Sequence, residues 1–263
     1  SFISSKTYKD YLGEDEFCDD FFSLSSYAGV KLPQKKFLLE NIFPYGNRCL
    51  VYGEKSSGKS SFMSDLCICI CNGDENYGSI RIDAKYHRTL YIGMEEEKED
   101  LVRRLQKQCE GRGYDLKCLE NCHFITRRNF FWECDNKFTE KFKRVLMRNK
   151  YDLVVVEPFR SLPEDENSNS KVQAVLNTLQ TITNDFEATM VIIAHPGKDV
   201  TKSTRGASAL EDDVRSVVKF CSKNMNEKTI NLEKGSFIYD PNLKMLPAYE
   251  VYENDYQNFE IGE

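Results

Sequence analysis

The sequence lacks a long hydrophobic run. No stretch of about 18 or more apolar residues occurs in its 263 residues, so we expect no membrane-spanning helix. The first residues, 1–8, also lack the basic segment followed by an apolar segment that marks a secretory signal. We therefore expect a cytoplasmic protein without a membrane partner.

The chain is poor in cysteine for a disulfide-stabilised protein. Its 10 cysteines in 263 residues lie below the share of roughly 8–10% that is typical of disulfide scaffolds. Three of them, Cys67, Cys69 and Cys71, stand in an apolar stretch and are typical of small buried hydrophobic side chains. We interpret the cysteines as reduced thiols of a cytoplasmic protein.

The chain also has no excess of positive charge. Its formal net charge is −6, with 36 basic and 42 acidic residues. This excludes a surface that is basic throughout, so any contact with nucleic acid has to come from local patches. Charged residues make up 30% and hydrophobic residues 40% of the chain, which indicates a folded protein with a heavily charged surface.

Residue patterns divide the chain into two zones. Residues 1–35 form an N-terminal arm in which acidic and aromatic residues are interleaved, and residues 36–263 form the main domain. An arm of this kind either packs on a neighbouring subunit or forms a short helix folded back on its own core, and the residues favour neither. The acidic and aromatic residues that show this interleaving are Asp10, Glu14, Asp15, Glu16, Phe17, Asp19, Asp20, Phe21 and Phe22.

From residue 36 on, short apolar segments alternate with helical patterns. Strands that are buried on both faces and separated by helices form parallel sheets. We therefore predict an α/β fold with a mainly parallel sheet flanked by helices. The predicted strands are 48–52, 89–93, 122–126, 153–156, 190–194 and 216–220, and the predicted helices are 59–70, 98–110 and one that carries Val172, Val175, Leu176, Leu179 and Ile182.

After Cys221 the pattern changes. Three further segments, 229–232, 237–239 and 248–252, are rich in β-branched and aromatic residues and follow one another without intervening helices. We predict that they form antiparallel strands at the C-terminal edge of the sheet.

The segment 53–60 reads GEKSSGKS and matches G-x-x-x-x-G-K-[S/T] at every fixed position. Glycines allow successive backbone N–H groups to turn toward phosphates, and the helix that follows directs the positive end of its dipole at them. Lys59 is expected to reach the β- and γ-phosphates of ATP, and the Ser60 hydroxyl to bind Mg²⁺. The predicted nucleotide-binding residues are Gly53, Glu54, Lys55, Ser56, Ser57, Gly58, Lys59, Ser60 and Ser61.

Two acidic positions follow predicted strands. Glu157 ends the strand 153–156, where a carboxylate can hold Mg²⁺ through water, although an ordinary charge at a strand end is the alternative. Glu95 follows the strand 89–93 and heads the run Glu95-Glu96-Glu97. A carboxylate there can polarise the water that attacks the γ-phosphate, and an acidic run is also typical of the first turn of a helix. We predict Glu95 as the catalytic base, with Glu96 as the next candidate.

Four local patterns occur in the order and spacing of a known family. They are FPYG at 43–46, YIGME at 91–95, VVEPFR at 155–160 and IAHPGK at 193–198, which runs on to RGASALED at 205–212. Together with the phosphate loop, they resemble the RepA-type, RecA-like P-loop ATPases, whose best-known members are hexameric replicative helicases of plasmids. The resemblance covers residues 36–235.

The resemblance implies a RecA-like ATPase domain at residues 36–263 and assigns roles to four residues. Glu95 is then the catalytic base, and Glu157 is the carboxylate on the Mg²⁺ side. His195 senses the γ-phosphate, and Arg205 is an arginine finger inserted into the site of the neighbouring subunit. This chain departs from the family at Glu157, where Asp is usual.

Two functions remain in competition at this point. The basic loop 198–205 follows the strand that ends at His195, and such a loop is a place for a moving contact to single-stranded DNA. This favours a DNA helicase or translocase in replication or repair, and the resemblance implies that it forms a ring-shaped homo-oligomer, a hexamer in the family. The net charge of −6 favours the alternative, an ATPase switch or loader that acts on a protein partner. A small-molecule kinase is disfavoured because no lid or acceptor site is evident.

Overall fold

The computed structural model describes residues 23–31, 35–93, 96–126, 136–157, 187–194, 214–235 and 248–262. The chain divides into two units, Ser1–Gln34 and Lys35–Glu263. In the first unit the described element is the 3₁₀ helix η2 (Leu24–Tyr27), which has no buried residue. All other described elements belong to the second unit. The predicted helix around 172–182 and the predicted strand 237–239 lie outside the described residues.

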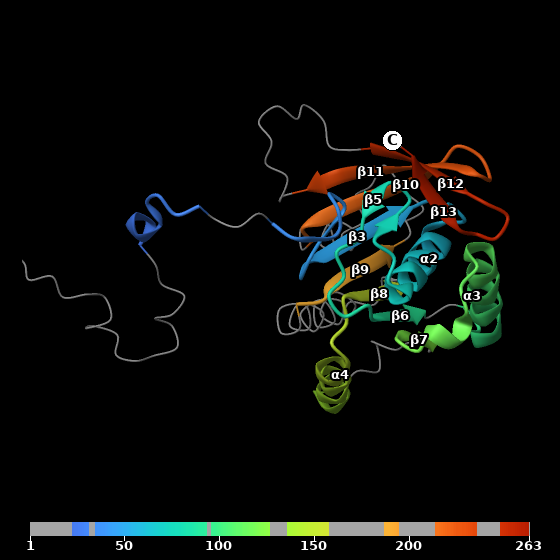
Figure 1. Cartoon of the computed structure of the whole chain (residues 1–263), viewed down its shortest axis with the longest axis horizontal. Coiled ribbons are helices and arrows are strands. Elements are labelled where there is room, and N and C mark those ends of the chain that lie inside the picture. The colour runs from blue at the N-terminus through green and yellow to red at the C-terminus, as the bar shows by residue number, and fades with distance from the viewer. Residues whose placement is uncertain are drawn as a thin grey trace, which may run out of the picture. The chain divides into compact units, whose positions relative to one another are not determined.

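A nine-stranded sheet organises the second unit (Figure 1). Its six strands from β10 to β7 are parallel, and the three strands beyond β10 are antiparallel. The parallel strands are the six that the sequence predicts. In sheet order the strands are β13 (Phe259–Gly262), β12 (Ala248–Glu253), β11 (Glu227–Gly235), β10 (Ser216–Ser222), β3 (Arg48–Gly53), β9 (Thr189–Ala194), β8 (Leu153–Glu157), β6 (Thr89–Gly93) and β7 (Cys122–Thr126).

Both faces of the inner parallel strands β6, β8 and β9 are buried, because apolar side chains occupy successive positions along them. In β8, Val155 packs into a core with Phe62 and Leu66 of helix α2 (Lys59–Asn72). Its neighbours Val154 and Val156 point to the other face. There they share a core with Phe142 and Leu146 of helix α4 (Asn136–Asn149). The continuous apolar runs of the sequence thus correspond to strands between two helical layers.

The C-terminal strands extend the sheet as antiparallel partners, as predicted. Strand β13 was not predicted, and it pairs with β12 at the edge of the sheet. Aromatic packing holds this extension on α2, since the Phe62 ring lies 5.1 Å from Phe220 of β10 and 5.5 Å from Phe259 of β13. Helix α3 (Lys98–Arg112) follows β6, with buried Leu101 and Leu105.

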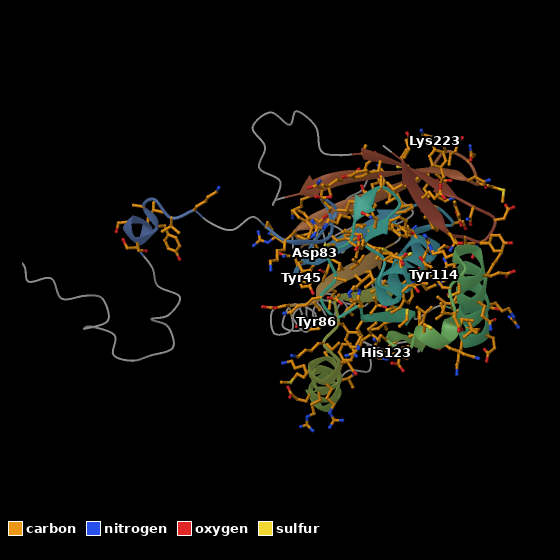
Figure 2. All side chains as sticks on the ribbon, viewed as in Figure 1. Tyr45, Asp83, Tyr86, Tyr114, His123 and Lys223 are labelled. Atoms are coloured by element: carbon orange, nitrogen blue, oxygen red, sulfur yellow. The ribbon has the colours of Figure 1, made fainter. Side chains whose placement is uncertain are left out.

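The amino ends of the parallel strands are joined by one buried carboxylate. Asp152, which is fully buried, accepts hydrogen bonds from the Tyr45 hydroxyl at 2.5 Å and from the backbone N–H groups of Lys85, Tyr86 and Arg88. Figure 2 labels Tyr45 and Tyr86 near the amino ends of the strands. It also labels Lys223, which directly follows β10 and lies toward the carboxyl ends. The nucleotide motif therefore lies at the edge away from this carboxylate.

Short elements complete the unit. The hairpins β1 (Phe37–Leu39) with β2 (Phe43–Pro44) and β4 (Asn76–Tyr77) with β5 (Ile80–Arg81) form separate two-stranded sheets, and η3 (Leu116–Cys118) leads into β7. Among the described helices, none combines the length and the apolar character needed to cross a membrane. All eight cysteines within the described ranges are free thiols.

Candidate functional site

Four chain segments with predicted functional residues leave the sheet at one edge. In the parallel register, Gly93 pairs with Glu157, and Tyr52 pairs with Ala194. The phosphate loop begins after Tyr52, at Gly53. Because parallel strands end at a common edge, the phosphate loop, Glu157, the acidic run after Gly93 and the segment after Ala194 all start there. This edge is where an open α/β sheet binds its ligands.

Glycine is required at two positions of the phosphate loop. Gly53 has φ +154°, and a Cβ there would lie 2.2 Å from the backbone oxygen of Phe220. Gly58 has φ +94° and stands immediately before the first residue of α2. A Cβ at Gly58 would lie 2.6 Å from the Cε atom of Lys228. The loop thus runs close to β10 and β11 and then turns into α2, whose amino end faces the loop.

Lys59 places its ammonium group inside the loop. The side chain is 2% exposed, and Nζ donates hydrogen bonds to the backbone oxygens of Gly53 at 2.7 Å and Glu54 at 2.6 Å. Its distance to the Ser57 hydroxyl is 3.2 Å. Burial lowers the pKa of Lys59 to about 8, although the negative charges of Glu157 and Glu54 oppose this shift. A phosphate group would compensate the burial of this cation.

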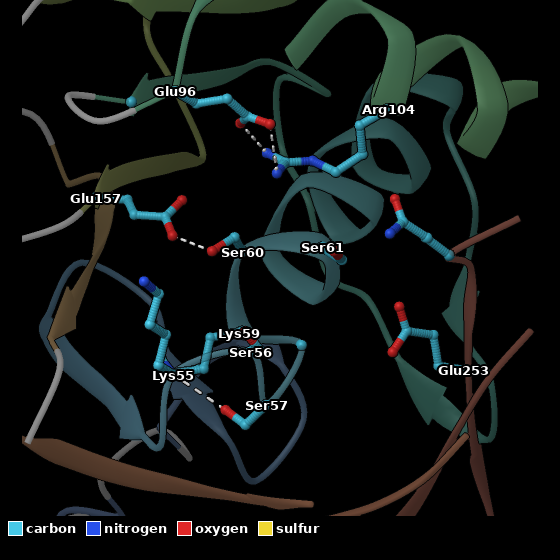
Figure 3. Close-up of a pocket in the computed structure, with 13 residues that line it drawn as sticks. Lys55, Ser56, Ser57, Lys59, Ser60, Ser61, Glu96, Arg104, Glu157 and Glu253 are labelled. Atoms are coloured by element: carbon cyan, nitrogen blue, oxygen red, sulfur yellow. Dashed lines mark hydrogen bonds and ion pairs between the residues drawn. The ribbon is translucent and has the colours of Figure 1, made fainter. Parts of the chain in front are cut away.

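Ser60 and Glu157 meet beside Lys59 (Figure 3). The Ser60 hydroxyl donates a hydrogen bond to Oε1 of Glu157. Burial raises the pKa of Glu157 to about 7, while the bond from Ser60 and the charge of Lys59 act in the opposite direction. A hydroxyl and a half-buried carboxylate at the carboxyl end of a strand are oxygen donors that Mg²⁺ prefers. These residues fit a Mg²⁺ ion, which would also reduce the cost of the buried negative charge.

The phosphate loop opens into a cavity of about 440 Å³. Three groups of residues form its wall, namely the loop with the start of α2, the carboxyl ends of β6 and β8, and residues of α3 and the C-terminal strands. The lining residues are Lys55, Ser56, Ser57, Gly58, Lys59, Ser60, Ser61, Gly93, Glu96, Arg104, Glu157, Glu253 and Gln257.

An ion pair between Glu96 and Arg104 forms one wall of the cavity. The guanidinium group of Arg104 lies 3.0 Å from Oε1 and 2.9 Å from Oε2 of Glu96. Burial raises the pKa of Glu96, and the neighbouring Arg104 partly offsets this effect. The Nε atom of Arg104 is buried and has no hydrogen-bond partner among the described residues.

The C-terminal strands form the opposite wall. Buried Lys228 of β11 and partly exposed Glu253 of β12 form an ion pair at 2.5 Å directly against Gly58. The following residue in the wall, Gln257, is tied to α3, because the Gln108 amide donates to the Gln257 carbonyl at 2.8 Å. The same Gln108 amide also donates to the Ser61 carbonyl at 2.9 Å. The wall is thus connected directly to the helix that starts at the phosphate loop.

A buried charge network strengthens this connection. Asp65 of α2, which has no exposed surface, accepts two hydrogen bonds from the Arg112 guanidinium at 2.7 and 2.6 Å. It also accepts bonds from the Asn258 amide at 2.8 Å and from the Phe259 backbone N–H at 2.9 Å. A buried carboxylate with these four donors fixes the turn before β13 against α2. The cavity wall is therefore held in place by the fold.

The structure brings Lys59, Ser60 and Glu157 together, as the sequence analysis expects of a nucleotide site. Glu96, the second candidate for the base, lines the cavity. Glu95, His195 and Arg205 lie outside the described residues, although the adjacent residues Gly93 and Ala194 stand at the site edge.

Sequence reasoning missed Arg104, Lys228, Glu253 and Gln257. Arg104 is one of several charged residues on α3, and the sequence contains no signal that sets it apart. Lys228 and Glu253 belong to C-terminal strands, and Gln257 lies in the turn between β12 and β13; their position beside the phosphate loop depends on long-range strand pairing. Residue spacing in the sequence does not predict this strand pairing.

Comparisons with known proteins agree with this geometry. A family model described as "AAA domain" matches residues 17–200. Among curated proteins, none matches the sequence significantly.

Solved structures share the fold at low sequence identity. The crystal structure of the RadB recombinase is 17% identical, with a TM-score of 0.61, and the match covers 84% of this chain and 93% of that one. A KaiC-like protein from the hyperthermophilic archaeon Pyrococcus horikoshii OT3 is 16% identical, with a TM-score of 0.58, over 89% of this chain and 100% of that one. These matches confirm the predicted RecA-like P-loop fold with its mainly parallel sheet.

Proposed function

The chain belongs to the AAA domain family, and on that premise we propose that it binds ATP with Mg²⁺ at the phosphate loop and hydrolyses it. One observation carries this proposal. The ammonium group of Lys59, the hydroxyl of Ser60 and the carboxylate of Glu157 converge at the amino end of α2. These are the three chemical groups that hold a polyphosphate and its cation in P-loop proteins.

Phosphate binding begins with an exchange of partners at Lys59. Its ammonium leaves the Gly53 and Glu54 carbonyls and pairs with the β- and γ-phosphates. The backbone N–H groups of the loop then donate to the phosphates, and the positive end of the α2 dipole adds to the attraction. Lys59 thereby remains buried while it gains a charged partner.

Ser60 and Glu157 are the residues that would hold Mg²⁺. When bound, the ion neutralises charge that develops on the β- and γ-phosphate oxygens during transfer. The Ser60 hydroxyl oxygen would bind the ion, and the Glu157 carboxylate, which accepts the Ser60 hydrogen bond, would hold it through water. Glutamate is one methylene longer than the usual aspartate and is already in contact with Ser60, which supports the same role.

Glu95 is the proposed catalytic base, and Glu96 is the second candidate. The carboxylate of Glu96 is occupied on both oxygens by Arg104, which leaves it poorly placed to accept a proton from water. This ion pair supports the assignment of the base to Glu95, the residue before it. We propose His195, which follows β9, as the γ-phosphate sensor.

The proposed function also includes an oligomeric state and a macromolecular partner. We propose a ring-shaped homo-oligomer, a hexamer by family resemblance, in which Arg205 completes the site of the adjacent subunit. Such a ring would act on single-stranded DNA as a helicase or translocase of the RepA type. The net charge of −6 supports the competing proposal of a switch or loader that acts on a protein partner.

Hydrolysis assays with and without single-stranded DNA test the choice of partner. Stimulation of ATP turnover by DNA, weakened by added salt, is expected for a motor on nucleic acid. Turnover that DNA leaves unchanged would favour the protein-directed switch. The mass of the protein in solution with Mg-ATP tests the ring, and a monomer at all protein concentrations would contradict it.

A further inference from the structure

Two cysteine side chains from different elements share one hydrogen-bonding partner. Cys71 lies in the last turn of α2, and Cys122 is the first residue of β7. Their sulfur atoms lie 3.2 Å and 3.4 Å from the hydroxyl oxygen of Thr89 in β6. Residues that are 51 positions apart in sequence thus place both sulfur atoms against one hydroxyl oxygen.

The environment of this pair separates it from the nucleotide site. Cys71 belongs to an apolar cluster between α2 and α3, and Cys122 packs against the same cluster. Cys71 is 9% exposed, and Cys122 is partly exposed. Among the described strands, β7 is the last of the sheet and pairs on one side only, with β6. An edge strand can shift slightly without breaking pairs on its other side, which permits the sulfur atoms to approach bonding distance.

We propose that Cys71 and Cys122 form a redox-active thiol pair that hydrogen peroxide oxidises to an intramolecular disulfide. The disulfide joins the end of α2 to the start of β7. Thiol reagents such as dithiothreitol reverse it. No step of the nucleotide chemistry uses either residue, and the pair is therefore a modification site in addition to the phosphate-loop site.

The reaction proceeds in two balanced steps. The Cys71 thiolate attacks one peroxide oxygen, an S–O bond forms, the O–O bond breaks, and the leaving hydroxide takes up a proton to become water. The Cys122 thiolate then attacks the sulfenic sulfur of Cys71, the S–S bond forms and the S–O bond breaks with release of a second water. Two thiols lose two electrons, and one peroxide is reduced to two waters.

The order of the two cysteines follows from the directions of their pKa shifts. The neighbouring Cys122 thiol and the Thr89 hydroxyl lower the pKa of Cys71 and favour its thiolate. The neighbouring Cys71 thiol and burial raise the pKa of Cys122. Cys71 is therefore the thiol that peroxide oxidises first, and Cys122 is the resolving thiol.

The test is peptide mapping of the peroxide-treated protein. The full chain is exposed to hydrogen peroxide, denatured in excess alkylating reagent and digested with trypsin. We expect a crosslinked pair of peptides that is lighter by two hydrogens than the sum of the reduced peptides, with alkylation lost at Cys71 and Cys122. Fragment-ion sequencing has to locate the link, because the same tryptic peptides carry Cys67, Cys69 and Cys118.

Two variants sharpen the result. Cys118 is exposed and lies outside the pair, so Cys118→Ser should form the crosslink to the same extent as the unmodified sequence. Cys122→Ser should lose the crosslink and leave Cys71 oxidised without a partner.

Full alkylation of Cys71 and Cys122 after a treatment that oxidises Cys118 would overturn the proposal. A dominant link between Cys118 and Cys122, or between Cys67 and Cys71, would overturn it as well. If Cys122→Ser does not fold, peptide mapping of the peroxide-treated protein with the unmodified sequence still tests the proposal.

Discussion

Glu157 lowers the stability of the protein when it is charged, and it is also the carboxylate proposed to hold Mg²⁺. It is a half-buried carboxylate with one hydroxyl donor and one nearby cation. Burial raises its pKa from the ordinary value of 4.5 to about 7, so the folded protein binds more protons than the unfolded chain between these pH values. Stability therefore decreases as pH rises through this window, and the full cost of the charged form is present above pH 7.

Glu157→Gln should accordingly stabilise the protein without nucleotide. At pH 8 the variant is expected to melt a few degrees higher than the unmodified sequence, because it no longer buries a charge. At pH 5 the difference should shrink, since Glu157 is then protonated in the fold. Thermal melts at the two pH values measure this, with the exposed Glu260→Gln as control. Addition of Mg-ATP should stabilise the variant less than the unmodified sequence. A variant that melts lower at pH 8 would contradict the account of Glu157.

The acidic run after β6 gives the second test at this scale. Glu95→Gln should leave ATP binding nearly intact and reduce turnover by roughly 10²-fold or more, as expected for loss of a general base. Glu96→Gln should disturb the contact with Arg104 and have the smaller effect on turnover. Steady-state hydrolysis rates of the two variants measure this. The opposite order of effects would make Glu96 the base.

At the scale of elements, the sequence predicts what local patterns determine. The six parallel strands and helices α2 and α3 are visible in it because apolar runs and helical periodicity are local features. The phosphate loop is visible for the same reason. Strand β13 and the wall made by Lys228 and Glu253 are not, because they depend on how the C-terminal strands pair after β10. The ion pair of Arg104 with Glu96 likewise depends on the angle at which α3 leaves β6.

The contact between the C-terminal wall and the phosphate loop predicts the effect of Gly58→Ala. A Cβ at Gly58 would lie 2.6 Å from Lys228 and 3.4 Å from Glu253, in a conformation with φ +94°. The loop should then move away from its phosphate-binding geometry, and Mg-ATP affinity should fall. Titration with Mg-ATP measures the loss.

Gly73→Ala is the matched control for Gly58→Ala. Gly73 has φ +83°, so its replacement carries a comparable backbone strain, but no atom lies within 4 Å of a Cβ there. Gly73 stands at the far end of α2, away from the cavity. Its replacement should reduce stability and leave nucleotide affinity unchanged. Equal affinity losses in both variants would show that the effect of Gly58→Ala is general strain.

At the scale of the whole molecule, the proposed ring predicts complementation between two inactive variants. Arg205→Ala subunits keep an intact phosphate loop, and Lys59→Ala subunits keep an intact finger. An arginine finger contributes roughly 10³-fold or more to turnover, so each variant alone should be nearly inactive. In a mixed ring, some interfaces pair a working loop with a working finger. Mixing should therefore restore part of the hydrolysis rate.

Gel filtration with ATP has to accompany this experiment. If mixed oligomers form and the rate stays at the sum of the two variants, Arg205 is not a finger that acts on the neighbouring subunit. If no oligomer forms with ATP, the ring proposal fails and the switch acting on a protein partner becomes the leading function.

The central claim is that this fold presents Lys59 to the phosphates of ATP, and calorimetric titration with Mg-ATP tests it most directly. A charged hydrogen bond contributes about 1.5–3 kcal/mol, which corresponds to roughly tenfold to a hundredfold in affinity. Lys59→Ala should lose at least that much, whereas Lys117→Ala, which removes an exposed lysine of η3, should bind as tightly as the unmodified sequence. Wild-type affinity in a folded Lys59→Ala protein would contradict the assignment of the site.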